Sequence, residues 1–379
     1  MNCKKVLIFI DWFLPGYKAG GPIQSIANFV THFGNELEIS IVTSNKDLGD
    51  VEPYNNLKFN KWNHKGNYRI IYLDKEHQNI SYFNFLLNEK LYDTVYFNSL
   101  FSVYYTLLPL LVAIKNKKRI VIAPRGMLGA GALNIKKTKK QLLLRVLKLS
   151  GIPKRISWQA TAESEVEEVK KCFGANTNVF LAPNLSAKMK SEIVGKTKVK
   201  GKLNLFFLSR IALKKNLKAA LQYLMEVSNE YKIRFAIIGP IDEIEYWKEC
   251  EQLIKKMPNH ITVNYIGAIP NLELPEILKE EHVMLLPTFH ENFGHVIMES
   301  FQNGCPVIIS DQTPWSNLEN KRMGWDINLN EPKKFIKAIE TMAKMNNLTY
   351  NEWSLNAFNF AKEKSNNETI IKAYGALFN

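Results

Sequence analysis

Short apolar runs rich in β-branched and aromatic residues alternate with longer amphipathic segments along the whole chain. The runs that read as strands lie at 5–10, 38–44, 68–73, 94–98, 119–124, 203–209, 234–239, 261–267, 283–287 and 306–310. Between several of them apolar residues recur with a helical period, as at Ile23, Ile26, Ala27, Val30 and Phe33. Strands that alternate with helices predict an α/β protein with parallel sheets built from β-α-β units.

The chain has 379 residues, which exceeds the usual size of a single hydrophobic core. A polar, basic and glycine-containing stretch at 186–202 separates two comparable sets of strands. We therefore predict two doubly wound, Rossmann-like domains that face each other, an N-terminal domain over 1–190 and a C-terminal domain over 200–355. In such sheets ligands bind at the carboxyl ends of the strands, where loops and helix N-termini meet.

The charge of the chain is unusual, with a formal net charge of +14 and a pI near 9.3. Such a chain favours a negatively charged partner, which can be a nucleic acid, an anionic membrane surface or a phosphate-bearing ligand. The sequence has no basic stripe interleaved with stacking aromatic residues and no familiar nucleic-acid-binding module. We therefore expect no nucleic-acid partner.

The cysteines and the longest apolar runs bear on the compartment. The four cysteines are scattered without a CxxC pair, which is typical of free thiols in a reducing compartment. The first apolar run is interrupted by Asp11 and is too short for a signal peptide. The run at 100–114 is too short to cross a bilayer and contains Pro109. These features predict a cytoplasmic protein.

The first candidate site is the stretch YKAGGPIQSIANF at 17–29. Gly20 and Gly21 follow the first strand, and Pro22 suits the first position of a helix. A helix that starts here presents free N–H donors to an anion, although the stretch can also be a tight turn alone. It lacks the GxGxxG pattern of a dinucleotide-binding fold, which disfavours an oxidoreductase.

The second candidate site is FFLSRIALKKNLKAAL at 206–221. Arg210 stands at the end of a strand, and Lys215 follows five residues later at the opening of a helix. Two cations at the carboxyl edge of a sheet suit a diphosphate. The alternative is that they are solvated surface charges.

The third candidate site is HENFGHVIMES at 290–300, which carries two glutamates. The pattern predicts Glu291 in a loop and Glu299 about two turns inside the following helix, with Gly294 allowing a tight turn at the helix start. Ionised carboxylates accept hydrogen bonds from sugar or ribose hydroxyls. Glutamates on a solvated helix face are the alternative.

These three motifs, in this order, resemble the retaining glycosyltransferases of family 4. The glycine loop, the Arg–Lys pair and the E-x7-E pattern all match, and further agreement comes from TAESEVEEV at 161–169 and APN at 182–184. The stretch APRGMLG at 123–129 is similar to a subgroup that builds bacterial surface polysaccharides. The resemblance implies the GT-B fold, in which two Rossmann-like domains face each other across a deep cleft. A helical segment over 356–379 would then pack back on the N-terminal domain.

The resemblance also implies an activity, which is the retaining transfer of a sugar from a UDP- or GDP-linked donor to a glycan or lipid-linked acceptor. Arg210 and Lys215 would neutralise the departing diphosphate, Glu299 would hold the ribose and Glu291 the sugar. No metal or resident cofactor is implied, and no DxD motif is present. The donor-binding residues expected are Gly20, Gly21, Arg210, Lys215, Gly239, Glu291, Asn292, Phe293, Gly294 and Glu299. A non-catalytic sugar-binding relative is the alternative.

One position departs from the family pattern. Many relatives have a histidine where this chain has Arg125, directly after the predicted strand at 119–124. An arginine is permanently charged and cannot act as a general base, but it can bind a sugar, a phosphate or an anionic acceptor. We therefore place Arg125 in the predicted catalytic set with Glu291, Arg210 and Lys215.

The segment 136–155, KKTKKQLLLRVLKLSGIPKR, has the pattern of a basic amphipathic helix. Its apolar residues are Leu142, Leu143, Val146, Leu147 and Leu149. Such a helix suits docking on anionic lipid at the inner face of the plasma membrane. The same leucines could instead pack into the N-terminal domain, so both interpretations stay open.

Overall fold

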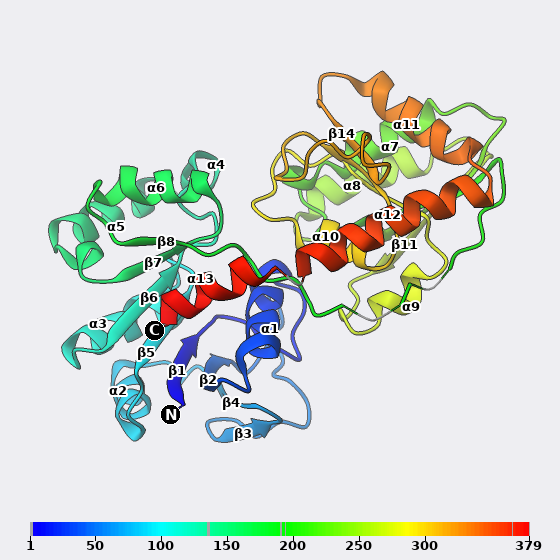
Figure 1. The fold of residues 1–379 in the computed structure, drawn as a ribbon. Helices are drawn as coiled ribbons and strands as arrows, with labels where there is room; N and C mark the ends of the chain where they lie inside the picture. The colour runs from blue at the N-terminus through cyan, green and yellow to red at the C-terminus, as the bar shows by residue number, and fades with distance from the viewer. Residues whose placement is uncertain (1–2, 135–136, 190–191, 194, 366, 379) are drawn as a thin grey trace. The chain divides into compact units, whose positions relative to one another are not determined.

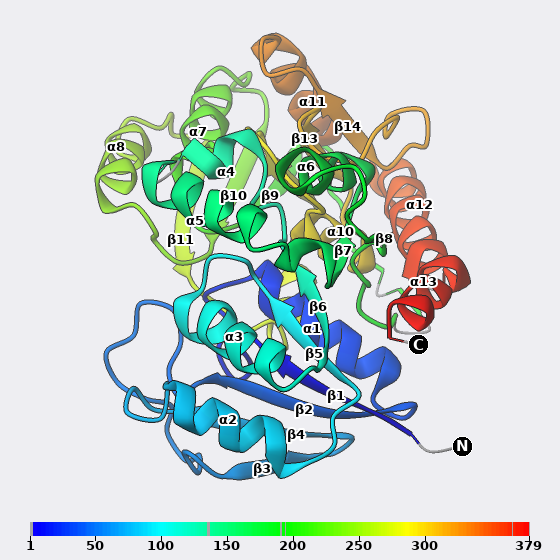
Figure 2. The same ribbon diagram turned by 90° about the vertical axis from the view of Figure 1, so that its left-hand side faces the viewer.

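The computed structural model describes residues 3–134, 137–189, 192–193, 195–365 and 367–378. Lys136 of the basic segment and residues 190, 191 and 194 of the predicted boundary lie outside the described residues. The chain divides into two compact units (Figures 1 and 2). Unit 1 comprises Met1–Lys188 and Asn367–Asn379, and unit 2 comprises Met189–Asn366.

Unit 1 contains an eight-stranded sheet in the order β3-β4-β2-β1-β5-β6-β7-β8. Neighbouring strands are parallel except for the antiparallel pair β3–β4. The strand order runs in opposite directions on the two sides of β1, as in a doubly wound sheet. The strands are β1 Lys4–Phe9, β2 Leu37–Ser44, β3 Trp62–Lys65, β4 Tyr68–Leu73, β5 Thr94–Asn98, β6 Arg119–Ala123, β7 Ser157–Ala160 and β8 Val179–Leu181.

Helices bury both faces of this sheet in separate apolar clusters. The C-terminal helix α13 joins α1 on one face, where Phe29 and Phe378 lie 5.0 Å apart between ring centroids. The helices are α1 Gly21–Phe33, α2 Ile80–Glu89, a π-helical turn η1 Val103–Leu107, α3 Leu108–Lys115, α4 Ala130–Asn134, α5 Lys137–Leu149, a 3-10 helix η2 Ile152–Lys154, α6 Glu163–Phe173 and α13 Glu368–Phe378.

Unit 2 contains a six-stranded parallel sheet in the order β11-β10-β9-β12-β13-β14. Its strands are β9 Lys202–Leu208, β10 Lys232–Ile238, β11 Ile261–Gly267, β12 Val283–Leu286, β13 Val307–Ser310 and β14 Gly324–Ile327. Its helices are the 3-10 helix η3 Leu213–Lys215, α7 Leu217–Met225, α8 Ile244–Ile254, α9 Leu274–Leu278, α10 His295–Gln302, α11 Pro332–Lys344 and α12 Asn347–Ser365.

The predicted fold class is confirmed, because each unit is an α/β layer structure with a largely parallel sheet. Every predicted strand is present, with bounds that differ by at most two residues. The strands that the pattern did not predict are β3, β7, β8 and β14, which have three or four residues each. The equally short β12 and β13 were recognised because they lie in continuous apolar runs, whereas β3, β7 and β14 contain polar residues and β8 has only three residues.

Two further observations concern the apolar segments and the thiols. Within the described part of the chain, no helix combines the length and the hydropathy that crossing a membrane requires. The four cysteines are free thiols, of which Cys250 and Cys305 are buried.

Candidate functional site

The predicted diphosphate-binding residues lie at the carboxyl edge of the unit 2 sheet. Arg210 follows β9, Lys215 ends η3, and Glu291 lies in the loop after β12. Strands β9 and β12 are parallel neighbours, so the loops that leave them meet at one edge. The structure therefore brings together residues that are about eighty positions apart in the sequence.

Lys215 and Glu291 form an ion pair in which the Lys215 ammonium donates to the Glu291 carboxylate. Their side chains are only 15% and 11% exposed. Backbone contacts hold the two loops together independently, because Phe289 N donates to the Lys214 carbonyl at 2.9 Å and the Asn216 amide donates to the Pro287 carbonyl at 2.9 Å. A pair this shielded from water interacts more strongly than a surface ion pair.

Arg210 has a carboxylate partner of its own, which the sequence did not predict. Its Nη1 lies 2.8 Å from Asp242 Oδ2, and the two side chains are 41% and 38% exposed. Exposed pairs contribute little to stability and exchange partners readily. Both predicted cations thus face carboxylates, and a diphosphate offers the same charge in a similar geometry.

Two titratable groups beside the pair, Lys214 and His290, have lowered pKa values. Burial, followed by the charge of Lys215, holds the pKa of Lys214 below its ordinary value. Burial, followed by the charge of Lys214, likewise lowers the pKa of His290. Burial disfavours a charge of either sign, so only the smaller contribution of the neighbouring lysines to each shift favours an anion at this edge.

Glu299 lies about one turn inside α10 rather than two, because α10 begins at His295 and not near Phe293. The Asn271 amide donates to Glu299 Oε1 at 2.8 Å. Burial raises the pKa of Glu299 to about 7, and the hydrogen bond from Asn271 opposes that shift. Glu291 and Glu299 are both partly buried. The alternative of glutamates on a solvated helix face therefore does not describe this motif.

Gly294 occupies the N-cap of α10 in the left-handed conformation, with φ 74° and ψ 60°. A Cβ atom there would lie 2.9 Å from Ile297 Cδ1 and 3.3 Å from Trp315 Nε1. Trp315 Nε1 also donates to the Phe293 carbonyl at 2.7 Å, which fixes the loop that includes Asn292. Conformation and close packing together explain the glycine that the motif requires.

Gly239, predicted to border the nucleotide base, follows β10 with φ 144°. A Cβ atom there would lie 1.9 Å from the Ser209 carbonyl oxygen. This glycine is therefore required by the close approach of the loops after β9 and β10, next to Arg210. Its N–H donates to the Gly267 carbonyl at 2.8 Å, which ties in the loop after β11.

In unit 1 the glycine motif forms a helix N-terminus, as the sequence predicted. Helix α1 begins at Gly21, Gly20 is the N-cap with φ 66°, and a proline lies in the first turn. Among the residues that the structure describes, no side chain caps this end. The N–H groups of the first turn are therefore not consumed by a capping side chain.

Arg125 lies directly after β6 and adopts a left-handed conformation with φ 55°. Its Nε and Nη2 donate to Asn98 Oδ1 at 3.0 and 2.8 Å, Nη2 also donates to Tyr96 Oη at 2.8 Å, and Nη1 donates to Asn184 Oδ1. The next residue, Gly126, donates its N–H to Glu165 Oε1 at 2.6 Å. Each guanidinium nitrogen thus has a neutral acceptor within unit 1.

Part of the chain is similar in sequence to known proteins. Residues 189–360 match the family model described as glycosyl transferases group 1. O-antigen chain mannosyltransferase B of Escherichia coli is 26% identical over 102 residues, which are 26% of this chain and 26% of that protein. The match thus spans about a quarter of the relative's length.

Solved structures resemble the chain over nearly its whole length. Sucrose-phosphate synthase from Thermosynechococcus elongatus has a TM-score of 0.71 and 13% identity, and the match covers 99% of this chain and 98% of that one. Anabaena HepE, solved in complex with UDP and glucose, has a TM-score of 0.67 and 13% identity, with 98% of each chain covered. The chain has the GT-B fold of these proteins, and its segment 189–360 carries the sequence pattern of the group 1 glycosyltransferases.

Proposed function

We propose that the protein is a retaining glycosyltransferase of bacterial surface polysaccharide synthesis. It moves a sugar from a UDP- or GDP-linked donor to a glycan or lipid-linked acceptor on the cytoplasmic side of the membrane. The observation that carries the proposal is the shielded Lys215–Glu291 pair beside Arg210 at the carboxyl edge of the unit 2 sheet. The family match over 189–360 and the O-antigen relative support it.

Arg210 and Lys215 stabilise the negative charge that develops on the departing nucleoside diphosphate. Positive groups fixed in advance at a leaving group lower the barrier because they need no reorganisation during the reaction. These two side chains supply the charge without a resident metal or cofactor. The N-terminus of α10, with Asn292, Phe293 and Gly294 at its entry, adds N–H groups to the same anion.

The two glutamates hold the neutral parts of the donor. When the diphosphate pairs with Lys215 in place of Glu291, the Glu291 carboxylate accepts hydrogen bonds from the sugar hydroxyls instead. Glu299 binds the ribose, where its carboxyl, with a pKa of about 7, accepts a hydroxyl hydrogen bond best when ionised. Gly239 allows the loops that border the base to approach each other.

In unit 1, the N-terminus of α1 at Gly20 and Gly21 provides N–H donors for an anionic group of a substrate. Arg125 contributes by holding the loop after β6, because its guanidinium is bound to Asn98, Tyr96 and Asn184. We assign it a positioning role in catalysis.

The experiment that tests the proposed function is a thermal-melting screen with UDP-, GDP-, ADP- and TDP-sugars. A UDP- or GDP-sugar should raise the melting temperature, whereas NAD(P) and duplex DNA should not. Stabilisation by NAD(P) or DNA alone would contradict the proposal. Donor binding without sugar transfer to any extracted glycan or lipid acceptor would favour the non-catalytic relative instead.

A further inference from the structure

Helix α5 of unit 1 has two apolar faces, which the sequence pattern could not separate. Leu147 is buried, and Leu143 and Leu144 pack partly buried against the same core cluster. A second set, Leu142, Val146 and Leu149, faces water with exposed fractions of 63%, 55% and 87%. At about 100° per residue, this second set lies within about 60° of the helix circumference and forms one stripe.

Cations surround the exposed stripe. The segment 137–155 contains no acidic residue. Its exposed cations are Lys137, Lys139, Arg145, Lys148, Lys154 and Arg155. An exposed apolar stripe flanked by cations has the composition of a helix that lies in a membrane interface.

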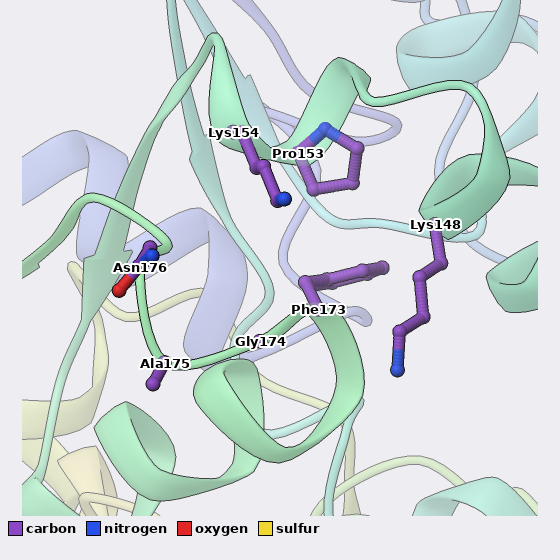
Figure 3. A pocket seen from close by; sticks show the side chains of 7 residues that line it. All are labelled: Lys148, Pro153, Lys154, Phe173, Gly174, Ala175 and Asn176. Carbon is purple, nitrogen blue, oxygen red and sulfur yellow. The ribbon is translucent and has the colours of Figure 1, made fainter.

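A hollow of about 330 Å³ lies beside α5, between α5, η2 and the end of α6. Figure 3 shows Lys148 and Lys154 approaching it from different elements, with the Phe173 ring between them in this view. The last turn of α6 adds the exposed Lys170 and Lys171 nearby. Lysines that line a hollow together with Phe173 and Pro153 suit a phosphate carried on an apolar molecule, such as the headgroup of an anionic lipid.

We propose that the α5 face, defined as Leu142, Val146 and Leu149 with Arg145, Lys148 and Lys154, docks on an anionic lipid surface. The three apolar side chains enter the boundary between headgroups and acyl chains, and the cations bind lipid phosphates. This interaction goes beyond sugar transfer and does not depend on the unit 2 site.

Charge complementarity selects this occupant over two others. A second copy of the chain would oppose one cationic stripe to another, which is repulsive. A nucleic acid would pair with the cations but would leave the three apolar side chains in water. Of these three occupants, the anionic lipid surface is the one that satisfies both the stripe and the cations.

The test is sedimentation of the full-length protein with vesicles of equal parts phosphatidylglycerol and phosphatidylcholine. We expect binding to these vesicles and not to pure phosphatidylcholine. Each neutralised cation should lower the partition coefficient about fivefold, so Arg145→Gln, Lys148→Gln and Lys154→Gln together should lower it about a hundredfold. The matched charge control is Lys232→Gln, Lys255→Gln and Lys256→Gln, three exposed lysines of unit 2.

The apolar stripe is tested separately by Leu142→Asn, Val146→Asn and Leu149→Asn, which should lower the partition coefficient at least about tenfold. The control is Ile80→Asn, Phe85→Asn and Leu91→Asn, because these residues of unit 1 are similarly exposed at 52%, 57% and 83%. The melting temperature of each variant reports whether the chain still folds.

Three outcomes would overturn the proposal. The first is equal loss of binding in the α5 and control variants. The second is binding that duplex DNA competes away and that the Asn substitutions in α5 leave unchanged. The third is a concentration-dependent dimer without vesicles that the α5 substitutions abolish, since the face would then join two copies.

Discussion

The carboxyl edges of the two sheets both hold a cation, but the partners of the two cations differ. In unit 1, Arg125 donates to the neutral oxygens of Asn98, Tyr96 and Asn184. In unit 2, Lys215 is paired with the carboxylate of Glu291. Neutral partners complete the hydrogen bonding of Arg125 without a ligand. A carboxylate partner can be exchanged for a phosphate of the same sign.

This difference separates a group that holds the fold from a group that binds a ligand. Removing a cation with neutral buried partners leaves those partners unsatisfied, which costs folding free energy. Removing Lys215 costs the interaction with the ligand and also leaves the shielded Glu291 carboxylate unpaired, which a second substitution at Glu291 relieves. With Glu291 neutralised as well, the expected effects divide between activity in unit 2 and stability in unit 1.

The largest effect is expected for Lys215→Ala, which should lower kcat/KM for sugar transfer by about a hundredfold to a thousandfold, because a charge at the leaving group is lost. The control is Lys218→Ala in the same helix region, whose partner Glu249 is exposed, and it should retain nearly full activity. Lys215→Ala leaves the Glu291 carboxylate without its cation. The double variant Lys215→Ala with Glu291→Gln removes this unpaired charge, and so separates a loss of activity from a loss of folding. Equal activities in the Lys215 and Lys218 variants would contradict the assignment of Lys215 to ligand binding.

Arg125→Gln should lower the free energy of unfolding by about 2–4 kcal/mol, because Asn98, Tyr96 and Asn184 lose the hydrogen bonds that its guanidinium donates. Arg155→Gln, at an exposed position in the same unit, should change it by less than about 0.5 kcal/mol. Urea unfolding measures both. A stable but inactive Arg125 variant would instead assign this residue to contact with donor or acceptor.

Glu299→Gln should change how stability depends on pH. The pKa of Glu299 is raised from 4.5 to about 7 in the folded protein, so the folded state binds the proton more tightly and stability falls as the pH rises from 4.5 to 7. Above pH 7 the ionised carboxyl costs up to about 3 kcal/mol, which the neutral Gln avoids.

The Gln variant should therefore melt at a higher temperature than the natural protein at pH 8, with little difference at pH 4. Melting curves across this range provide the measurement. A constant difference between the two proteins at all pH values would show that Glu299 does not titrate in this window.

Glu291→Gln should strengthen binding of the free nucleoside diphosphate about fivefold, because Lys215 no longer has a competing carboxylate, while sugar transfer falls. Asp242→Asn should have a smaller effect, about twofold, because its pair with Arg210 is exposed. Calorimetric titration with UDP and GDP measures both changes. Weaker binding in the Glu291 variant would mean that Glu291 supports the diphosphate site instead of competing for it.

The sequence predicted the fold and the edge of the sheet where Arg210, Lys215 and Glu291 meet. That success has a physical reason, since parallel strands direct all their carboxyl ends to one edge and the apolar runs of the strands are easy to recognise. The partners of these residues were not predicted. Asp242 and Asn271 lie in loops without a pattern, and their positions depend on how the loops fold.

The contacts of Arg125 and the burial of α5 residues likewise could not be predicted from local sequence patterns. The contacts of Arg125 reach Asn184, 59 positions away, and no local pattern encodes such a contact. In α5, the composition predicted a basic amphipathic helix, but only the surrounding core decides that Leu147 is buried and Leu142 exposed. Of the two interpretations that the sequence left open, packing into the N-terminal domain describes Leu143, Leu144 and Leu147, and docking on lipid stays a prediction.

The central claim is that the cations of the unit 2 edge bind the diphosphate of a nucleotide sugar in exchange for their carboxylates. Calorimetric titration of UDP and GDP into the natural protein and the Lys215→Ala variant tests it most directly. We expect measurable binding of one of the two nucleotides to the natural protein, and an affinity at least about tenfold lower in the variant. Equal affinity in the two proteins would contradict it.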